Sequence, residues 1–425
     1  NPVLKRAGDA VIAGSINGDG SLTIRITKIG TETFLAGVTR LIAEAESSKS
    51  RLQILSDRAA LWLTVIAVSA GGLTLVAWLS VGSGIAFSVE RLVAVLVVAC
   101  PHALGLAVPL VAAISTSLAS RNGFLVRKRL ALETARTVDV VLFDKTGTLT
   151  EGKFSVTFSS SDEALALAAA VEKHSEHPIG KAIVMEAERR NLSIADATDF
   201  KRIPGAGAEA TVSGVRVFVG HRGGADLVVE ADGKKTGTLR VADTPRAEAK
   251  EAVASLRNLG ISVAMITGES DEAAKEVAGQ LGITDYFARV IPVEKVEKVK
   301  LLQAQGKKVA MVGDGVNDAP ALTQADVGIA VGAGTNVAVE SAGIILVRND
   351  PRDIPKIITL SKLTYSKMIQ NLFWATGYNV VALPLAAGAL FSYGIILEPA
   401  LAAVFMSAST VIVAINAVLL RGQRL

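Results

Sequence analysis

Cysteine is nearly absent from this chain of 425 residues, which contains one cysteine, four histidines and 4% aromatic residues. A single cysteine excludes an internal disulfide, so Cys100 is a metal ligand, a nucleophile or a core residue. A strong net charge is also missing, because the formal charge is only +4. We therefore predict no nucleic-acid partner. The chain does not begin with Met, and we expect a fragment that lacks the N-terminal part of a longer protein.

Apolar residues, in contrast, make up 50% of the chain. Crossing a bilayer takes roughly 20 of them in a row. Lys and Arg collect at one end of the long uncharged runs, whereas the short loops at the other end carry only Arg91. The positive-inside rule then predicts an integral membrane protein with a cytoplasmic middle segment and cytoplasmic ends. The four runs are Leu61–Ser80, Leu92–Ser120, Leu372–Leu397 and Ala400–Leu420.

The second run contains the sequence VVACPHALG, in which Pro101 stands between Cys100 and His102. Proline has no N–H, and its ring clashes with the carbonyl of Val97, so the helix is expected to break here. A broken helix at membrane depth exposes carbonyl groups, which only a protein interior or a water-lined cavity tolerates. Thiolate and imidazole ligands favour copper or zinc. The alternative is a kinked helix with a packed cysteine and a hydrogen-bonded histidine.

The middle of the chain alternates short apolar runs with helix-like segments, which predicts a parallel, doubly wound sheet. In such sheets ligands bind at the carboxyl ends of the strands. Residues 155–236 break the alternation and predict an inserted domain, and residues 1–45 predict a small β piece. The expected strands are Val138–Phe143, Ile261–Ile266, Val309–Val312 and Val327–Val331, and the expected helices are Glu163–Glu172, Gly180–Asn191, Arg246–Leu259, Asp271–Leu281 and Val293–Ala304.

Two motifs follow the expected strands. In DKTGTLTEG, Asp144 is a carboxylate at a strand end, a position that suits nucleophilic attack on a phosphoryl group. In GDGVNDAP, Asp314 and Asp318 offer the hard oxygens that Mg²⁺ prefers. Thr267 and Lys295 are candidates for binding the phosphoryl oxygens.

DKTGTLT together with GDGVNDAP resembles the P-type ATPase family. The resemblance implies that Asp144 is phosphorylated and, with Asp314 and the Thr146 carbonyl, holds Mg²⁺. It also implies that Lys295 contacts the phosphate and that Asp318 supports the site. The segment DTPR, residues 243–246, resembles the hinge between the nucleotide and phosphorylation domains of that family.

The segment VEKHSEHPIG resembles the Ser-Glu-His-Pro element of the heavy-metal-transporting subgroup, type IB. The resemblance implies that Glu172 and His177 meet the adenine end of ATP. PGAGAEA resembles the glycine loop of that subgroup, in which Gly205 and Gly207 let the backbone approach the nucleotide. We expect no catalytic role for Glu269 in ITGES.

Cys-Pro-His, together with NLFWATGYN and MSAST in the last two apolar runs, resembles the copper-translocating subclass of these pumps. The resemblance implies ATP and Mg²⁺ as cofactors and Cu⁺ or Cu²⁺ as the transported ion. The expected partners are membrane lipid, the metal ion and a copper chaperone. The candidate transport-site residues are Cys100, His102, Tyr378, Asn379, Met406, Ser409 and Thr410.

The expected fold class is a multidomain membrane protein. It combines an α-helical transmembrane bundle, a haloacid-dehalogenase-like α/β phosphorylation domain, an inserted α+β nucleotide-binding domain and a partial β actuator domain. The expected boundaries are residues 1–45 for the actuator piece, 46–120 for a transmembrane hairpin, 121–154 and 237–355 for the phosphorylation domain, 155–236 for the nucleotide-binding domain, and 356–425 for two C-terminal transmembrane helices.

The predicted function is ATP-driven copper export through an aspartyl phosphate, in the plasma (inner) membrane of a prokaryote. The alternatives are a zinc, cadmium or cobalt pump of the same family, a membrane-tethered phosphohydrolase of the same superfamily, and a non-enzymatic metal-binding membrane protein. In the family, the Thr-Gly-Glu-Ser loop that drives dephosphorylation precedes the position of Asn1. We therefore expect these residues alone to bind nucleotide but to turn over poorly.

Overall fold

The computed structural model describes residues 50–173, 177–203, 206–222, 226–314, 316–332 and 340–423, together with residues 6, 8, 9, 11, 22–27, 29, 30, 36, 175 and 425. Most of the β piece expected at residues 1–45 lies outside these residues, as does Gly205. The chain forms two compact units. The helical unit is Asn1–Thr137, Gly343–Arg348 and Lys356–Leu425, and the sheet unit is Val138–Ala342 and Asn349–Pro355.

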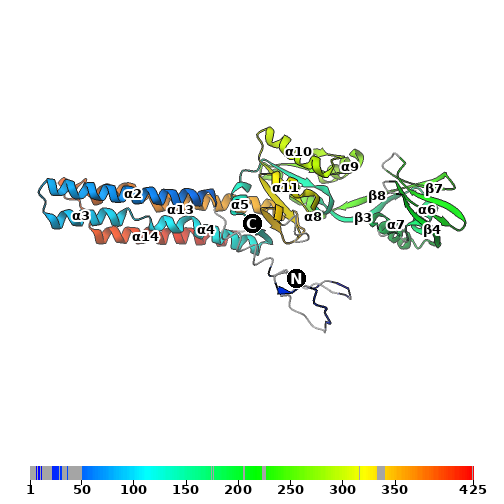
Figure 1. Cartoon of the computed structure of the whole chain (residues 1–425), viewed down its shortest axis with the longest axis horizontal. Helices are drawn as coiled ribbons and strands as arrows, with labels where there is room; N and C mark the ends of the chain where they lie inside the picture. Colours follow the sequence, from blue (N-terminus) through cyan, green and yellow to red (C-terminus); the bar gives the residue numbers. More distant parts are fainter. Residues whose placement is uncertain are drawn as a thin grey trace. The chain divides into compact units, whose positions relative to one another are not determined.

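Long helices make up most of the helical unit (Figure 1). They are α2 (Arg51–Ser80), α3 (Ile85–Val98), α4 (His102–Arg121), α13 (Asp353–Ala387) and α14 (Pro399–Val418). The Ser50 hydroxyl caps α2 by accepting a hydrogen bond from the Gln53 N–H. Small residues such as Ala94, Ala386 and Ala402 are buried where α3, α13 and α14 meet, and they let the helix backbones approach closely. The unit also contains α5 (Arg129–Ala135) and an antiparallel pair of strands, β1 (Phe124–Val126) and β13 (Ile344–Leu346).

Among the described residues, three helical stretches are long and apolar enough to cross a membrane: Arg51–Ser80, Ile85–Arg121 and Pro399–Gly422. They confirm three of the four predicted runs. The fourth run, Leu372–Leu397, is not one of these three, and α13 covers it only as far as Ala387. A membrane span at this run stays a prediction. Gly388, with a φ of +92°, turns the chain out of the helix, and the 3₁₀ turn η4 (Phe391–Tyr393) follows.

A parallel sheet with the strand order β12-β11-β2-β9-β10 lies in the sheet unit. Each of the four predicted strands is confirmed, as β2 (Val140–Asp144), β9 (Ser262–Ile266), β11 (Val309–Gly313) and β12 (Val327–Val331), and β10 is Asp285–Phe287. The helices between them are α8 (Ala247–Asn258), α9 (Asp271–Leu281), α10 (Pro292–Ala304) and α11 (Ala319–Gln324). Strands β2, β11 and β12 are buried along their whole length, which is why they read as continuous apolar runs.

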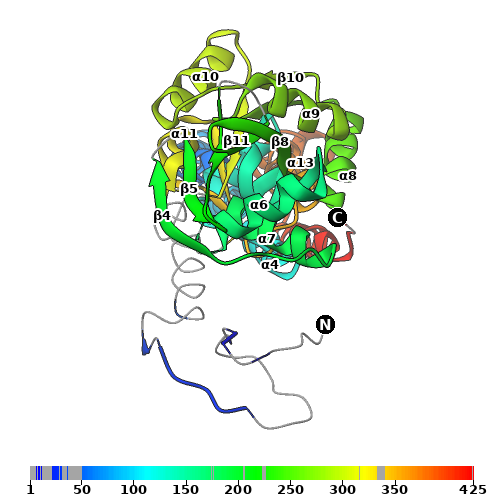
Figure 2. The ribbon, with the colours of Figure 1, turned by 90° about the vertical axis from the view of Figure 1, so that its right-hand side faces the viewer.

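The inserted segment forms a second, antiparallel sheet with the order β3-β8-β7-β6-β5-β4. Helices α6 (Asp162–Glu172) and α7 (Pro178–Arg189) pack on it (Figure 2). Leu165, Ile183 and Val219 belong to the buried apolar cluster between these helices and the sheet. In the chain, α6 and α7 come before β4 to β8, which confirms the prediction that helices precede strands in this segment. The strands are β3 (Thr150–Ser159), β4 (Ala197–Ile203), β5 (Gly207–Val212), β6 (Val215–Gly220), β7 (Leu227–Ala231) and β8 (Lys234–Pro245).

Candidate functional site

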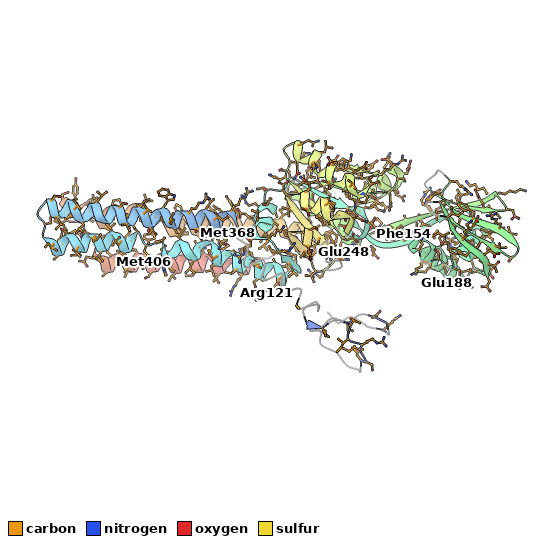
Figure 3. All side chains as sticks on the ribbon, in the orientation of Figure 1. Arg121, Phe154, Glu188, Glu248, Met368 and Met406 are labelled. Carbon is orange, nitrogen blue, oxygen red and sulfur yellow. The ribbon has the colours of Figure 1, made fainter. Side chains whose placement is uncertain are left out.

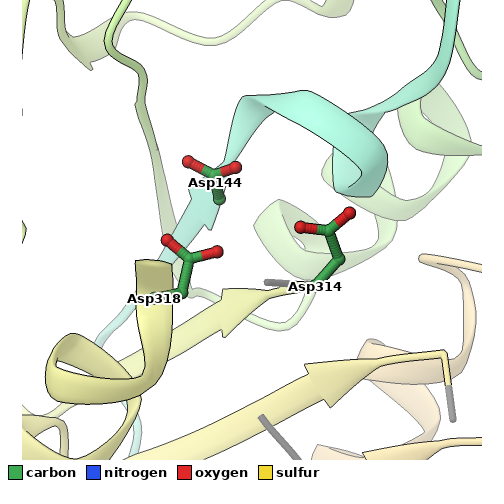
Figure 4. A group of neighbouring side chains, drawn as sticks. All are labelled: Asp144, Asp314 and Asp318. Carbon is green, nitrogen blue, oxygen red and sulfur yellow. The ribbon is translucent and has the colours of Figure 1, made fainter. Parts of the chain in front are cut away.

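Three carboxylates meet at the carboxyl edge of the parallel sheet. Asp144 is the last residue of β2, Asp314 follows β11, and Asp318 directly precedes α11. Their side chains surround one space, and one oxygen from each lies within 4.8 Å of the others (Figure 4). The sequence places these residues far apart, and the parallel pairing of β2 with β11 brings them together.

Lys295, from the first half of α10, lies between two of these carboxylates. Its Nζ is 2.5 Å from Asp144 Oδ1 and 2.6 Å from Asp318 Oδ1. All three side chains are at least nine-tenths buried. The ammonium group therefore holds the two like charges together and orients the Asp144 carboxylate.

The electrostatics of this cluster are unbalanced, with three carboxylates against one ammonium group. Burial, reinforced by the charge of Asp318, raises the pKa of Asp144 to about 7. Burial and Asp318 also raise the pKa of Asp314. Burial alone would lower the pKa of Lys295, but the Asp144 and Asp318 carboxylates raise it above its ordinary value. The site thus has an excess of negative charge that a divalent cation would relieve.

The loop after Asp144 is shaped by close backbone approach. Gly147 has a φ of +72°, and a Cβ atom there would lie 1.9 Å from Asp314 Oδ2, so only glycine fits. Thr146 is exposed, whereas the buried hydroxyl of Thr148 bonds to none of the described residues. The Thr148 hydroxyl therefore keeps its own hydrogen-bonding capacity.

Further polar side chains hold this loop from outside. The Lys145 ammonium, which is 1% exposed, pairs with Glu269, a residue for which we expected no catalytic role. Thr150 Oγ1 donates to Asp243 Oδ2 at 2.5 Å, and burial raises the pKa of Asp243. Arg246 donates to the Gly147 carbonyl at 3.3 Å. Both ends of the DTPR segment therefore contact the loop.

Thr267 follows β9 and is 2% exposed. Its hydroxyl accepts a hydrogen bond from the Glu269 N–H at 3.2 Å, which orients the hydroxyl group. Strand β9 pairs with β2 so that Ile266, the residue before Thr267, lies opposite Asp144. The parallel sheet thus brings Thr267 to the same edge as the carboxylate cluster.

Two of the predicted nucleotide-binding residues lie at the junction of α6 and α7. Glu172 ends α6, is buried, and its carboxylate lies so close to Gly180 that a Cβ there would be 2.4 Å from it. His177 is exposed and caps α7, because its Nδ1 accepts a hydrogen bond from the Ile179 N–H. The cap leaves Nε2 of His177 for another partner.

Gly207 begins β5, where it pairs with Gly220 of β6. Its φ is +154°, and a Cβ would lie 2.1 Å from the Val219 carbonyl oxygen. Close strand packing therefore requires a glycine at this position, independently of any nucleotide. Nucleotide contact by Gly205 and Gly207 stays a prediction.

In the helical unit, the helix is interrupted at Ala99–Pro101, between α3 and α4, as Pro101 predicts. Cys100 and His102 are both exposed at this break. The Tyr378 hydroxyl of α13 donates to the Val98 carbonyl at 3.3 Å, just before the break. The structure thus brings one predicted residue of α13 to the predicted helix break.

Asn379, the neighbour of Tyr378, is 3% exposed, and neither its amide oxygen nor its nitrogen bonds to any described residue. On α14, Met406 is half-buried (Figure 3). The Ser409 hydroxyl donates to the Trp374 carbonyl, and the Thr410 hydroxyl donates to the Met406 carbonyl. Each hydroxyl oxygen keeps a lone pair for a further contact.

Hydrogen bonds within the helical unit join Asn371, Asn416 and Lys367, none of which we predicted as a site residue. Asn371 belongs to the NLFWATGYN segment. Its position within an apolar run was the available signal, because a polar group among helices that lack water needs a partner. Asn416 carries the same signal on α14.

The chain is similar to known proteins over nearly all of its length. The family model of the haloacid dehalogenase-like hydrolases matches residues 138–326. Over 99% of its length the chain is 53% identical to a copper-exporting P-type ATPase B of Archaeoglobus fulgidus. It is 42% identical to a probable copper-transporting P-type ATPase B of Staphylococcus haemolyticus. The chain spans 64% and 66% of the lengths of these two relatives.

Solved structures give the same result. A zinc-transporting PIB-type ATPase in the E2.Pi state superposes with a TM-score of 0.73 at 32% identity. The match covers 92% of this chain and 68% of that one. The catalytic domain of the CPx-ATPase CopB-B, a structure that concerns conformational changes upon nucleotide binding, superposes with a TM-score of 0.53 at 35% identity over 58% of this chain and 98% of that one.

Relatives of this kind, together with the three apolar helical stretches, identify an integral membrane protein. They also confirm the predicted fold class, a helical membrane part combined with a haloacid-dehalogenase-like domain. The chain therefore belongs to the PIB-type ATPases, the heavy-metal-transporting branch of the P-type ATPase family.

Proposed function

We propose that the chain is the catalytic and metal-binding core of an ATP-driven copper exporter that works through a phosphorylated Asp144. The observation that carries the proposal is the buried cluster of Asp144, Asp314, Asp318 and Lys295 at the sheet edge. An Asp144 oxygen attacks the γ-phosphorus of ATP, the bond to the β–γ bridging oxygen breaks, and ADP leaves. Lys295 and Thr267 are positioned to bind the phosphoryl oxygens.

Mg²⁺ fits the same cluster, because Asp144 and Asp314 supply hard oxygen ligands, and burial together with the charge of Asp318 raises the pKa of both. We propose the Thr146 carbonyl as a third ligand. When bound, Mg²⁺ neutralises charge on the transferring phosphoryl group. The ion pair with Asp318 holds the Lys295 ammonium group beside Asp144 during the proposed phosphoryl transfer.

ATP is proposed to lie against the second sheet, with its adenine end near Glu172 and His177. The helix cap at His177 leaves Nε2 for the nucleotide, which supports this assignment. Gly205 and Gly207 are proposed to border the same site.

Copper is proposed to bind at the break between α3 and α4 through Cys100 and His102, with Tyr378, Asn379, Met406, Ser409 and Thr410 as further candidates. Sulfur and imidazole ligands suit Cu⁺, and imidazole accepts Cu²⁺ as well. The buried, unpartnered amide of Asn379 supports the presence of a guest near it. The copper-exporting and copper-transporting relatives support copper as the substrate. The plasma membrane of a prokaryote is the proposed location, and a copper chaperone is a proposed partner.

The decisive experiment measures phosphorylation of the full-length protein from radiolabelled ATP, with Cu⁺, Cu²⁺, Zn²⁺, Cd²⁺ and Co²⁺ each supplied alone. We expect copper to produce an acid-stable, hydroxylamine-labile label at Asp144, and Cys100→Ala to remove it. Labelling by zinc, cadmium or cobalt instead of copper would assign a different cargo. Metal-dependent labelling that persists in Cys100→Ala would favour a membrane-tethered phosphohydrolase.

A further inference from the structure

A chain of three hydrogen bonds joins α13, α14 and α4 of the helical unit, running from half-buried to fully buried side chains. Lys367 Nζ donates to Asn416 Oδ1 at 2.7 Å, and Asn416 Nδ2 donates to Asn371 Oδ1 at 2.8 Å. Asn371 Nδ2 then donates to the Ala107 carbonyl at 3.1 Å. We call Lys367, Asn416 and Asn371 the amide relay. It links α13 to α14, returns to α13, and ends on α4.

The direction of the amide relay is determined by its two ends. An ammonium group can only donate a hydrogen bond, and a backbone carbonyl can only accept one. Each asparagine between them must therefore present its oxygen toward Lys367 and its nitrogen toward Ala107. Asn371 is completely buried, so a reversed amide there would face the Ala107 carbonyl with an unpaired oxygen.

The relay ends on a weakened part of α4. Pro109 lies inside this helix and has no N–H, so the Gly105 carbonyl loses its helical partner. Ala107 lies between these two residues, on the segment that begins at His102. A second donor from another helix binds nearby, since Ser56 Oγ of α2 donates to the Leu104 carbonyl at 3.3 Å.

Side chains of α2 and α13 thus hold the start of α4 from outside. The three helices joined by the relay also carry the proposed copper ligands: α4 carries His102, α13 carries Asn379 and α14 carries Met406. A change in how α4 is held against α13 and α14 would change the distances between these ligands, and metal sites tolerate such changes poorly.

We propose that Lys367, Asn416 and Asn371 are positioning residues that set the geometry of the metal site through the Ala107 carbonyl. This inference rests on the proposed function. It assigns a role to the charge of Lys367 that does not depend on contact with the metal: the ammonium group polarises the relay so that its last amide donates to α4.

The direction of the hydrogen bonds in the relay can be tested at Lys367, because one substitution there keeps a hydrogen-bond donor and another replaces it by an acceptor. Lys367→Gln keeps a donor for Asn416 and preserves the direction of the relay. Lys367→Glu supplies an acceptor, which turns both asparagine amides and points the Asn371 oxygen at the Ala107 carbonyl. Lys362→Glu makes the same change of charge at an exposed position of the same helix and serves as the control.

The experiment uses the full-length protein and titrates phosphoenzyme formation from ATP with copper. We expect Lys367→Glu to raise the copper concentration for half-maximal labelling about tenfold. Lys367→Gln and Lys362→Glu should stay within about twofold of wild type. Labelling from inorganic phosphate in the absence of metal, which reports on the sheet unit, should be unchanged in all three variants.

Equal titrations for Lys367→Glu and Lys367→Gln would overturn the relay, and so would an equal effect of Lys362→Glu. Loss of labelling from inorganic phosphate in Lys367→Glu would also overturn it, because the effect would then not be confined to metal binding. A wild-type protein that is labelled from inorganic phosphate but never responds to copper would instead overturn the proposed copper function.

Discussion

The carboxylate cluster of the sheet unit and the helix break of the helical unit differ in how far their side chains are already paired with one another. Lys295 already joins Asp144 and Asp318 through short, buried ion pairs. At the helix break, Cys100 and His102 are exposed, and the buried amide of Asn379 has no partner among the described residues. The carboxylate cluster is therefore preorganised, whereas the side chains near the helix break have fewer partners among the described residues.

The functions that we propose for the two sites account for this difference. Phosphoryl transfer is accelerated by charges that are in place before the reaction starts, so a rigid arrangement is favourable. A transport site has to bind its ion in one conformation and release it in another. Ligands that are partnered mainly by the ion make the conformational equilibrium respond to the ion itself.

The largest effect that would test the preorganised site is the loss of its nucleophile. Asp144→Asn should abolish the acid-stable label, because an amide cannot form the acyl phosphate. The exposed residue Asp285 offers a matched control, and Asp285→Asn should keep full labelling. Label retained in the Asp144 variant would assign the phosphate to another residue.

Removal of the central cation is the next largest effect. Lys295→Met leaves two close carboxylates without their shared ammonium group, and we expect phosphoenzyme formation to slow about 100-fold. Rapid-quench labelling measures the rate. Lys300→Met, which removes an exposed pair with Glu297 on the same helix, should have almost no effect. Similar rates in both variants would show that the cluster does not need its cation.

A single added methyl group can disturb the same cluster. Gly147→Ala should place a Cβ on Asp314 and slow labelling by roughly tenfold to a few tens of fold. Gly152 has nearly the same φ, +69°, but no atom lies within 4 Å of its virtual Cβ. Gly152→Ala therefore measures the effect of backbone strain alone. If it slowed labelling as much as Gly147→Ala does, the contact with Asp314 would not explain the effect at Gly147.

The smallest expected effect tests the proposed copper site near the helix break. Asn379→Leu replaces an unpartnered amide by an apolar group of similar volume, so the free energy of unfolding should hardly change. The copper concentration for half-maximal labelling should nevertheless rise about tenfold. The same substitution at the exposed neighbour Val380 is the control. A thermal shift without a change in copper response would make Asn379 a structural residue.

Much of the sheet unit was predictable from local pattern. Helix α9 has the predicted bounds, and β2, β9, β11 and β12 differ from prediction by two residues or fewer. The helical unit was less predictable. The run at Leu372–Leu397 has a membrane-like composition, but the turn at Gly388 divides it. Composition measures transfer into lipid, whereas a helix end depends on backbone conformation.

Contacts between distant residues were the least predictable part of both sites. The pairing of Lys145 with Glu269 and the amide relay join residues whose sequence neighbours give no sign of their partners. Gly207 was predicted to border the nucleotide. The structure gives a second reason for a glycine there, because a Cβ would clash with the Val219 carbonyl oxygen of the neighbouring strand.

Residue type and order determined which chemistry this protein can perform: a carboxylate at a strand end, hard oxygens nearby, and sulfur and imidazole at a proline break. Only the tertiary structure decided which of these groups share a charge, which are already partnered and which remain open. The physical reason is that hydrogen bonds and ion pairs depend on distances of a few ångströms between residues far apart in the chain, and only the packed fold sets those distances.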